Sequence, residues 1–398
     1  MEGKRLLRSI TLKNILSFGP EGQTLDFEPL NVLIGPNGSG KSNLIDVFRL
    51  LEGLPRDMSE PLAKGGGIKE WVWKGLNSSP GFSISSEWDS NHSEQFTRHS
   101  INVNVRDSRY YVSHERIALG SQVDLPLLKY NFENAQGVFF EDESLTPGQP
   151  GHVRETRSNT IQDDQSILAQ RRDADRYKEI ENLWMNYTLI LIYKDWTFGE
   201  SAEPRKLQRA DMTELFLGEG GYNLNLILRK LIRDPDKKTR LVEEFRKIYE
   251  GARDIKIKQL EEFLSLNVEE ESGQLIPAIR LSDGTLRYLN LLAVLLDPHP
   301  YSLTCIEEPE LGLHPDIIPT IARLLIEASQ HTQLIVTTHS ADLISALGDV
   351  PEAVIVCERG FDGETTMNRL DPKKMEEWLK EYTLGHLWAS GEIGGNRW

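Results

Sequence analysis

One segment of the chain fits a phosphate-binding loop at every position of the pattern G-x-x-x-x-G-K-[ST]. Glycines let backbone N–H groups turn toward phosphate oxygens, and the N-terminus of a following helix adds positive charge. Lys41 is expected to reach the β- and γ-phosphates of a nucleotide, and Ser42 to ligate Mg²⁺. A glycine-rich turn without a ligand is the alternative. The residues predicted to contact the nucleotide are Gly35, Pro36, Asn37, Gly38, Ser39, Gly40, Lys41, Ser42 and Asn43.

Such a loop needs a strand before it and a helix after it. The apolar run Leu30–Ile34 stops at Gly35 and predicts the strand. Apolar residues at 3–4 spacing predict a helix from about Lys41 to Gly53: Leu44, Ile45, Phe48 and Leu51. Both elements are therefore expected around the loop.

A second segment places carboxylates directly after a predicted buried strand, Leu303–Ile306. Ligands of α/β sheets bind at the C-terminal ends of the strands. We therefore expect Glu307 to hold the magnesium ion and Glu308 to polarise the attacking water as general base. An acidic surface loop is the alternative, and the strand upstream speaks against it.

Two further polar positions flank this segment. Ser282 precedes a predicted helix, where its hydroxyl, the Gly284 N–H and the helix dipole could face a phosphate. His339 follows another apolar strand, 31 residues after Glu308. Taken alone, the serine is an ordinary helix N-cap and the histidine a structural hydrogen-bonding residue.

The rest of the chain predicts an α/β protein with additional parts. From residue 283 onward helices and strands alternate, which is typical of a parallel sheet. Period-two alternation over 81–140 predicts antiparallel strands. The remaining predictions are strands over 6–34, a loop with little structure over 54–80, a mobile loop over 141–162, mainly helix over 163–250 and strands over 260–281.

Composition limits the possible protein classes. The 398 residues include 45 basic and 61 acidic side chains, a net charge of −16, with 39% hydrophobic residues. This composition is typical of globular proteins. The acidic balance argues against a protein that coats nucleic acid by bulk charge, but it does not exclude a local basic groove. Two cysteines exclude a disulfide framework and favour the cytoplasm. No apolar stretch approaches the roughly 20 residues of a membrane helix.

Taken in order, these motifs resemble the ABC-type ATPase heads of chromosome-maintenance (SMC), RecF-type and double-strand-break-repair proteins. The Walker A loop 35–42 is followed by a signature-like segment 281–285, a Walker B segment 306–310, a D-loop-like segment 311–315 and a switch histidine, His339. Glu-Glu-Pro-Glu followed by Leu-Gly-Leu-His-Pro is most similar to stand-alone ATPases related to the overlapping-lysogenization-defect (OLD) nucleases.

The resemblance implies a P-loop ATPase fold with a mixed sheet core, an antiparallel β subdomain and an inserted helical lobe. The corresponding parts are 1–140, with Walker A and the β subdomain, 141–280, the helical lobe, and 281–398, with the remaining motifs. It implies ATP and Mg²⁺ as cofactors and a head-to-tail homodimer or a higher oligomer built from it. In that dimer Ser282 and Gly284 complete the partner's nucleotide site. Lys41, Glu308 and His339 would carry catalysis, with Ser42 and Glu307 on the metal.

The sequence also departs from the family pattern. Glu307 stands where many ABC proteins have aspartate, and Asp283 stands where transporters have glycine. Gln165 and Gln170 are the candidates for the family's Q-loop glutamine, with an exposed helix face as the alternative. The helical middle is too short for a long coiled-coil arm. The 59 residues after His339 are too few for the TOPRIM nuclease domain of OLD proteins.

These features predict an ATP-dependent switch that controls a separate effector, such as a TOPRIM-type nuclease or a toxin, or acts on DNA. Related ATPases often act in defence against phage. The alternatives are a DNA repair or maintenance ATPase of RecF/SMC type, the ATP-binding subunit of a transporter, a nuclease in its own right and an ATP-binding scaffold with little hydrolysis. The large insertion before Ser282 argues against the transporter, and the intact Glu308 and His339 argue against the scaffold.

Overall fold

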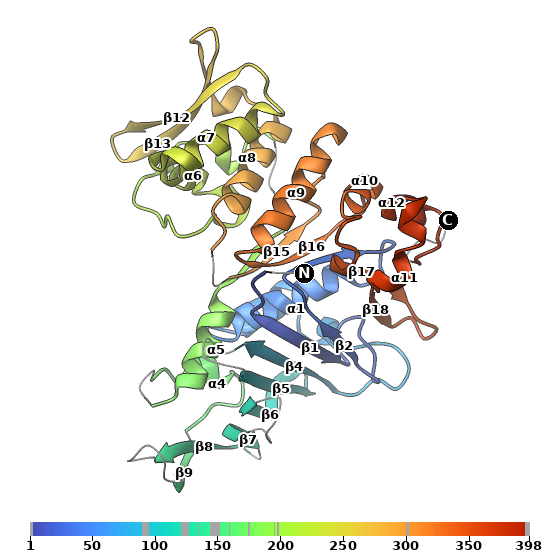
Figure 1. The fold of residues 1–398 in the computed structure, drawn as a ribbon. Coiled ribbons are helices and arrows are strands. Elements are labelled where there is room, and N and C mark those ends of the chain that lie inside the picture. Colours follow the sequence, from blue (N-terminus) through green and yellow to red (C-terminus); the bar gives the residue numbers. More distant parts are fainter. Residues whose placement is uncertain are drawn as a thin grey trace.

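The fold contains a central sheet with a second large sheet at one end and a helical lobe at the other (Figure 1). The structure is a computed structural model. It describes residues 3–89, 95–120, 127–133, 135–143, 152–158, 160–173, 176–194, 196, 199–299 and 302–394.

The central sheet has the strand order β10-β15-β16-β3-β17-β18. Neighbouring strands are parallel except for the last pair, β17 and β18. The first four strands and β17 are mostly apolar, and they are buried except at the last residues of β15 and β17, as expected for a sheet covered on both faces. The bounds are β3 Leu30–Ile34, β10 Ile190–Tyr193, β15 Leu303–Glu307, β16 Gln333–Thr337, β17 Val354–Arg359 and β18 Thr365–Arg369.

Alternate residues of each strand face opposite sides of this sheet and join two hydrophobic cores. Leu33 and Ile335 pack with α1 (Lys41–Gly53) and the second sheet. Val32 and Val336 pack with the helices on the other face. The helices of this core are α6 Leu224–Arg233, α7 Pro235–Arg246, α8 Asp283–Leu295 and α9 Ile318–Ser329, of which α9 contacts β3 and β16 while α6 and α7 contact α8. The sheet is therefore held between two apolar layers, and its C-terminal edge is left for polar residues.

The second sheet is antiparallel and has the order β2-β1-β4-β5-β6-β7-β8-β9. Its bounds are β1 Leu7–Lys13, β2 Gln23–Asp26, β4 Gly81–Asp89, β5 Phe96–Arg106, β6 Arg109–Gly120, β7 Leu127–Glu133, β8 Gln136–Glu143 and β9 His152–Ser158. The helices α4 Ile167–Gln170 and α5 Lys178–Thr188 follow it. The period-two prediction for 81–140 is confirmed.

A small sheet lies in the helical lobe, above α6 and α7 in Figure 1. Its strands are β11 Gln208–Arg209, β12 Ala252–Leu260, β13 Phe263–Glu270 and β14 Leu275–Pro277. Three short helices, α10 Ala341–Ser345, α11 Pro372–Met375 and α12 Leu384–Ala389, lie near the C-terminus. Among the described residues, none of the helices combines the length and hydrophobicity that crossing a bilayer requires.

Two local predictions were wrong, and a third missed one strand. The segment 54–80 contains α2 (Ser59–Lys64) and α3 (Ile68–Trp71), which are held by the buried Leu62 and Trp71. The predicted mobile loop 141–162 contains β9, which pairs with β8, and its residues 144–151 and 159 lie outside the described residues. The segment 163–250 contains the helices α4, α5, α6 and α7, as predicted, and in addition β10, a strand at the edge of the central sheet that the prediction missed. Strand β10 depends on pairing with β15, more than 100 residues away, whereas β9 pairs with the strand that immediately precedes it.

Candidate active site

The loop between β3 and α1 has a backbone that requires glycine at two positions. Gly35 and Gly40 have φ angles of 149° and 100°. A Cβ atom on Gly35 would lie 2.2 Å from the Cys357 carbonyl oxygen, and one on Gly40 would lie 2.1 Å from Thr365 Oγ1. Thr365 Oγ1 also donates to the Ser39 carbonyl at 3.0 Å. Strand β18 therefore supports the loop from behind.

Lys41 is folded back over this loop. Its Nζ donates to the carbonyls of Gly35 at 2.8 Å and Pro36 at 3.1 Å, and the residue is 6% exposed. Desolvation lowers the pKa of Lys41, while the nearby Cys357, Glu308 and Glu307 act in the opposite direction. The ammonium is thus held by carbonyl groups of the loop itself.

Asn43 and Ser39 differ in their hydrogen bonding around the loop. The Asn43 amide donates to Ser17 Oγ at 2.7 Å, so this side chain holds the loop to the N-terminal region. Ser39 Oγ is buried and has no hydrogen-bond partner within the described part of the chain. An unpartnered hydroxyl is costly unless a ligand satisfies it. Ser39 therefore has a buried hydroxyl that a ligand could satisfy, whereas the Asn43 amide N–H is already bonded to Ser17.

Ser42 and Glu307 meet although 265 residues separate them. The Ser42 hydroxyl donates to Glu307 Oε1 at 2.5 Å, because β15 and α1 both end or begin at this edge of the sheet. A hydroxyl and a carboxylate are hard oxygen donors of the kind that Mg²⁺ prefers together with phosphate oxygens and water. The donor set therefore fits the magnesium ion that the resemblance implies.

Glu308 and His339 lie beside this pair. His339 Nε2 is 3.7 Å from Glu308 Oε1, and each side chain is about one third exposed, at 35% and 34%. Glu308 has a φ of 45°, a strained value for a residue with a side chain. Burial, and next the charge of Lys41, lower the pKa of His339 below its ordinary value. A neutral imidazole and an accessible carboxylate thus face the same space.

Glu310 positions the switch segment, a role that sequence reasoning did not assign. Its Oε1 accepts hydrogen bonds from Thr338 Oγ1 at 2.5 Å and from the His339 backbone N–H at 3.2 Å. Burial raises the pKa of Glu310. This carboxyl group therefore connects the Walker B segment to the loop that carries His339.

The signature-like segment is organised by a second residue that the sequence did not reveal, Arg205. Its guanidinium donates to the carbonyls of Ala278, Ile279 and Leu281 and to the Asp283 carboxylate. Arg205 is the main cause of the lowered pKa of Asp283. The aspartate that departs from the family pattern thus anchors this segment.

Ser282 has only local hydrogen bonds within the described structure. Its Oγ accepts from the Thr285 backbone N–H at 3.1 Å, so it caps α8. A Cβ on Gly284 would lie 3.0 Å from the Gly312 carbonyl oxygen, which places the signature-like segment against the D-loop-like segment. Ser282 and Gly284 therefore lie beside the D-loop-like segment. Among the described residues, neither makes a hydrogen bond to residues 35–42.

Neither glutamine proposed for the Q-loop is placed at this site. Gln165 contacts Asp57 and Met58, beyond the C-terminal end of α1, and thus about 20 Å of helix away from the loop. The Gln170 amide group donates to carbonyls of its own segment. The side chain beside Glu307 from the neighbouring strand is instead Lys194, whose Nζ is 3.9 Å from Glu307 Oε2.

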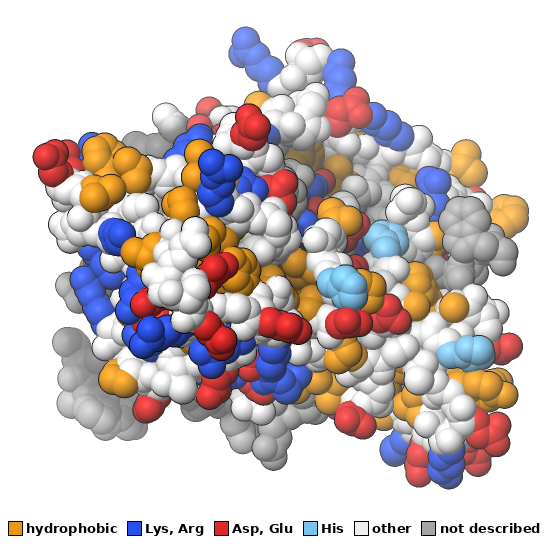
Figure 2. Space-filling model, turned by 90° about the horizontal axis from the view of Figure 1, so that it is seen from above, with side chains coloured by type: hydrophobic (Ala, Val, Ile, Leu, Met, Phe, Trp, Pro, Cys, Tyr) orange, Lys and Arg blue, Asp and Glu red, His pale blue; other side chains and the backbone are white. Residues whose placement is uncertain are grey.

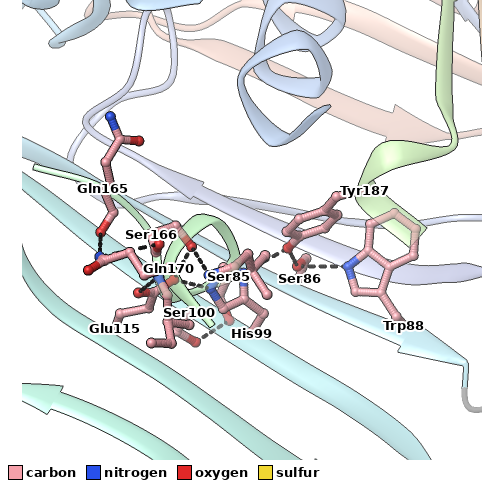
Figure 3. A network of polar contacts seen from close by, with 12 residues as sticks. Ser85, Ser86, Trp88, His99, Ser100, Glu115, Gln165, Ser166, Gln170 and Tyr187 are labelled. Atoms are coloured by element: carbon pink, nitrogen blue, oxygen red, sulfur yellow. Dashed lines mark hydrogen bonds and ion pairs between the residues drawn. The ribbon is translucent and has the colours of Figure 1, made fainter. Parts of the chain in front are cut away.

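A second polar network lies between the antiparallel sheet and the helices α4 and α5 (Figure 3). His99 connects Tyr187 OH at 2.8 Å to Glu115 Oε1 at 3.0 Å, and Glu115 also accepts from Ser166 Oγ at 2.5 Å. His99 and Glu115 are each 1% exposed. A serine, a histidine and a carboxylate could suggest a hydrolase, but solvent does not reach them here. The network instead fixes α4 and α5 to the sheet.

The fold is that of the ATPase head domains of Smc proteins. The structure aligns with an Smc head bound to the C-winged helix domain of ScpA at a TM-score of 0.57 and 15% identity, over 94% of this chain and 100% of that one. It aligns with the Smc head domain of Pyrococcus furiosus, bound to the C-terminal domain of ScpA, at 0.55 and 15% identity, over 94% and 98%. At this identity the likeness concerns the fold.

Residues 30–345 match the family described as "AAA domain, putative AbiEii toxin, Type IV TA system", and the chain belongs to that family. Two chromosome partition proteins Smc are 37% identical over 73 residues, from Mycolicibacterium paratuberculosis and Mycobacterium tuberculosis. That match covers 18% of this chain and 6% of either relative, so the chain spans a small part of their length.

Proposed function

We propose that the protein binds ATP at the loop 35–42 and hydrolyses it. The observation that carries this proposal is the convergence of Lys41, Ser42, Glu307, Glu308 and His339 at one edge of the central sheet, with the Ser42–Glu307 contact at 2.5 Å. Loop N–H groups and Lys41 would hold the phosphates. Glu308 would take a proton from the attacking water, and His339 would donate a hydrogen bond to the γ-phosphate. Bound Mg²⁺, held by Ser42 and Glu307, would neutralise developing phosphate charge.

We further propose that ATP joins two copies head to tail, and that Ser282 and Gly284 of one copy complete the site of the other. Ser282 stands at the N-terminus of a 13-residue helix and has only a local cap partner, so its hydroxyl and the helix dipole could bind phosphate from a second subunit. Hydrolysis would release the two heads, which makes the dimer a switch.

The output of this switch is proposed to be a separate effector. The words "putative AbiEii toxin, Type IV TA system" in the family description support a toxin-type output. A nuclease effector and a role in defence against phage remain further parts of the proposal. The likeness to Smc heads supports an alternative function in DNA maintenance. On the face in Figure 2, basic side chains are interspersed with acidic ones, and the net charge of the chain is −16. Binding of DNA would therefore require a local cluster of basic side chains.

The decisive experiment uses Glu308→Gln. This variant should bind ATP with Mg²⁺, release no phosphate and elute as a dimer in size-exclusion chromatography, because the ATP that joins the heads persists. The wild-type protein with ADP should elute as the smaller species. A variant that binds ATP and remains a monomer would refute the shared site, and a wild-type protein that produces no calorimetric heat with ATP and Mg²⁺ would refute the proposal as a whole.

A further inference from the structure

Lys194 lies beside the metal-binding carboxylate because of the strand order in the central sheet. Strand β10 pairs in parallel with β15, and the register sets Tyr193 opposite Ile306. The next residues along the two strands, Lys194 and Glu307, therefore emerge side by side at the edge where the phosphate loop lies. They are 113 residues apart in the sequence, so only the fold brings them together.

The Lys194 ammonium shares Glu307 with the Ser42 hydroxyl. Nζ is 3.2 Å from Asp46 Oδ1 and 3.9 Å from Glu307 Oε2, while the other oxygen, Oε1, accepts from Ser42. Asp46 is one helical turn after Ser42 on α1. Lys194 and Glu307 are only 23% and 16% exposed, so solvent screens their charges less than it screens a surface pair.

The other cation of the site does not contact these carboxylates. Lys41 donates to the loop carbonyls of Gly35 and Pro36. Among the described residues of the site, the ammonium of Lys194 is thus the positive charge in contact with both Asp46 and Glu307. A divalent cation that approaches Glu307 meets like charge already in place, and repulsion at this range is strong in a partly buried site.

We propose that Lys194 is a tethered counter-ion of Glu307 that keeps the nucleotide-free protein from binding free Mg²⁺ tightly. The metal then enters together with the phosphates of ATP, whose negative charge outweighs the repulsion. This inference rests on the proposed function, since it takes Glu307 as a metal ligand. Lys194 therefore acts on the metal through Glu307, and its charge lowers the affinity of the nucleotide-free protein for Mg²⁺.

If Lys194 served only to orient Glu307, removal of the lysine would change the affinity for the metal in the opposite direction. The glutamate arm is one methylene longer than the aspartate found in many ABC proteins, so an ion pair could restrict it. Loss of the lysine would then weaken metal binding. Loss of the counter-ion instead strengthens metal binding, and this difference separates the two roles.

The test measures Mn²⁺ alone, titrated into nucleotide-free full-length protein and followed by electron paramagnetic resonance of free Mn²⁺. Lys194→Met should bind Mn²⁺ about tenfold more tightly than wild type, because a unit charge near the metal is removed. Lys194→Arg should restore wild-type affinity. Lys206→Met, which removes a surface lysine paired with Glu203 at 2.6 Å, is the matched control and should change nothing.

The gain must also depend on Glu307, so Lys194→Met in a Glu307→Gln background should show none. A gain of about threefold or more that disappears in this background supports the proposal, and any smaller change or a loss overturns it. Lys194→Gln takes the same measurement if Lys194→Met does not fold. ATP binding by the wild-type protein is measured separately, so failure of the proposed function is distinguishable from failure of this inference.

Discussion

The guanidinium of Arg287 donates a 2.6 Å hydrogen bond from Nη2 to the backbone carbonyl of Glu308. Arg287 belongs to α8, the helix that Ser282 caps, and the residue is 2% exposed. Burial lowers its pKa to about 10, so it remains a cation at neutral pH. The helix of the signature-like segment is therefore attached directly to the strained backbone of the proposed general base.

This attachment predicts that Arg287→Met lowers ATP turnover without preventing ATP binding. A hydrogen bond to a charged group contributes about 1.5–3 kcal/mol, so a loosened Glu308 should cost roughly tenfold in kcat. Phosphate release and calorimetry would measure the two quantities. Arg280→Met changes an exposed residue of the same region and serves as the control. Unchanged turnover in Arg287→Met would show that the contact is structural only.

Removal of the Lys41 ammonium should abolish most of the affinity for ATP. Lys41→Ala takes away a fixed charge that would bind two phosphates, and we expect a loss of about 100-fold in affinity by isothermal titration. Lys64→Ala is the matched control because Lys64 is exposed and pairs with Glu60 in α2. Normal ATP affinity in Lys41→Ala would contradict the assignment of the loop.

The sequence predicted the elements whose signals are local. The glycine pattern and the apolar spacing gave α1 with the bounds that the structure has, and Ser282 caps α8 as expected. The strand Leu303–Glu307 ends at the carboxylates because a short apolar run between polar residues has few other interpretations. At these positions residues within about ten places of one another determine the structure.

The residues that sequence reasoning missed act through partners far away in the chain. Lys194 depends on the pairing of β10 with β15, and Arg205 contacts carbonyls more than 70 residues away. Glu310 was visible only as part of an acidic motif, and its contact to His339 depends on neighbouring strands. The strand β10 was hidden between helical patterns, since four apolar residues fit a helix or a strand equally well.

The lowered pKa of His339 predicts that its imidazole is neutral at pH 7 and takes up a proton only below pH 6.5. The native state then binds fewer protons at this group than the unfolded state. The stability from His339 is thus fully present above pH 6.5 and is lost as pH falls through the native pKa. Nuclear magnetic resonance of labelled histidines, assigned with His339→Gln, would measure the midpoint.

Lys41→Ala should shift that midpoint upward, because the charge of Lys41 is one cause of the lowered pKa. The removal of a positive charge makes protonation of the imidazole easier. A midpoint at or above 6.5 in the wild-type protein would contradict the prediction. A midpoint that Lys41→Ala leaves unmoved would mean that burial alone lowers the pKa.

Mixing two inactive variants should restore activity if each nucleotide site is shared between two copies. Ser282→Arg blocks the signature-like segment, and Lys41→Ala blocks the phosphate loop. In a mixed head-to-tail dimer, the intact loop of the first faces the intact Ser282 of the second, so one of the two sites is complete. Phosphate release by the mixture should clearly exceed that of either variant alone. A mixture as inactive as its components, although both variants are folded and Ser282→Arg still binds ATP, would mean that each copy closes its own site.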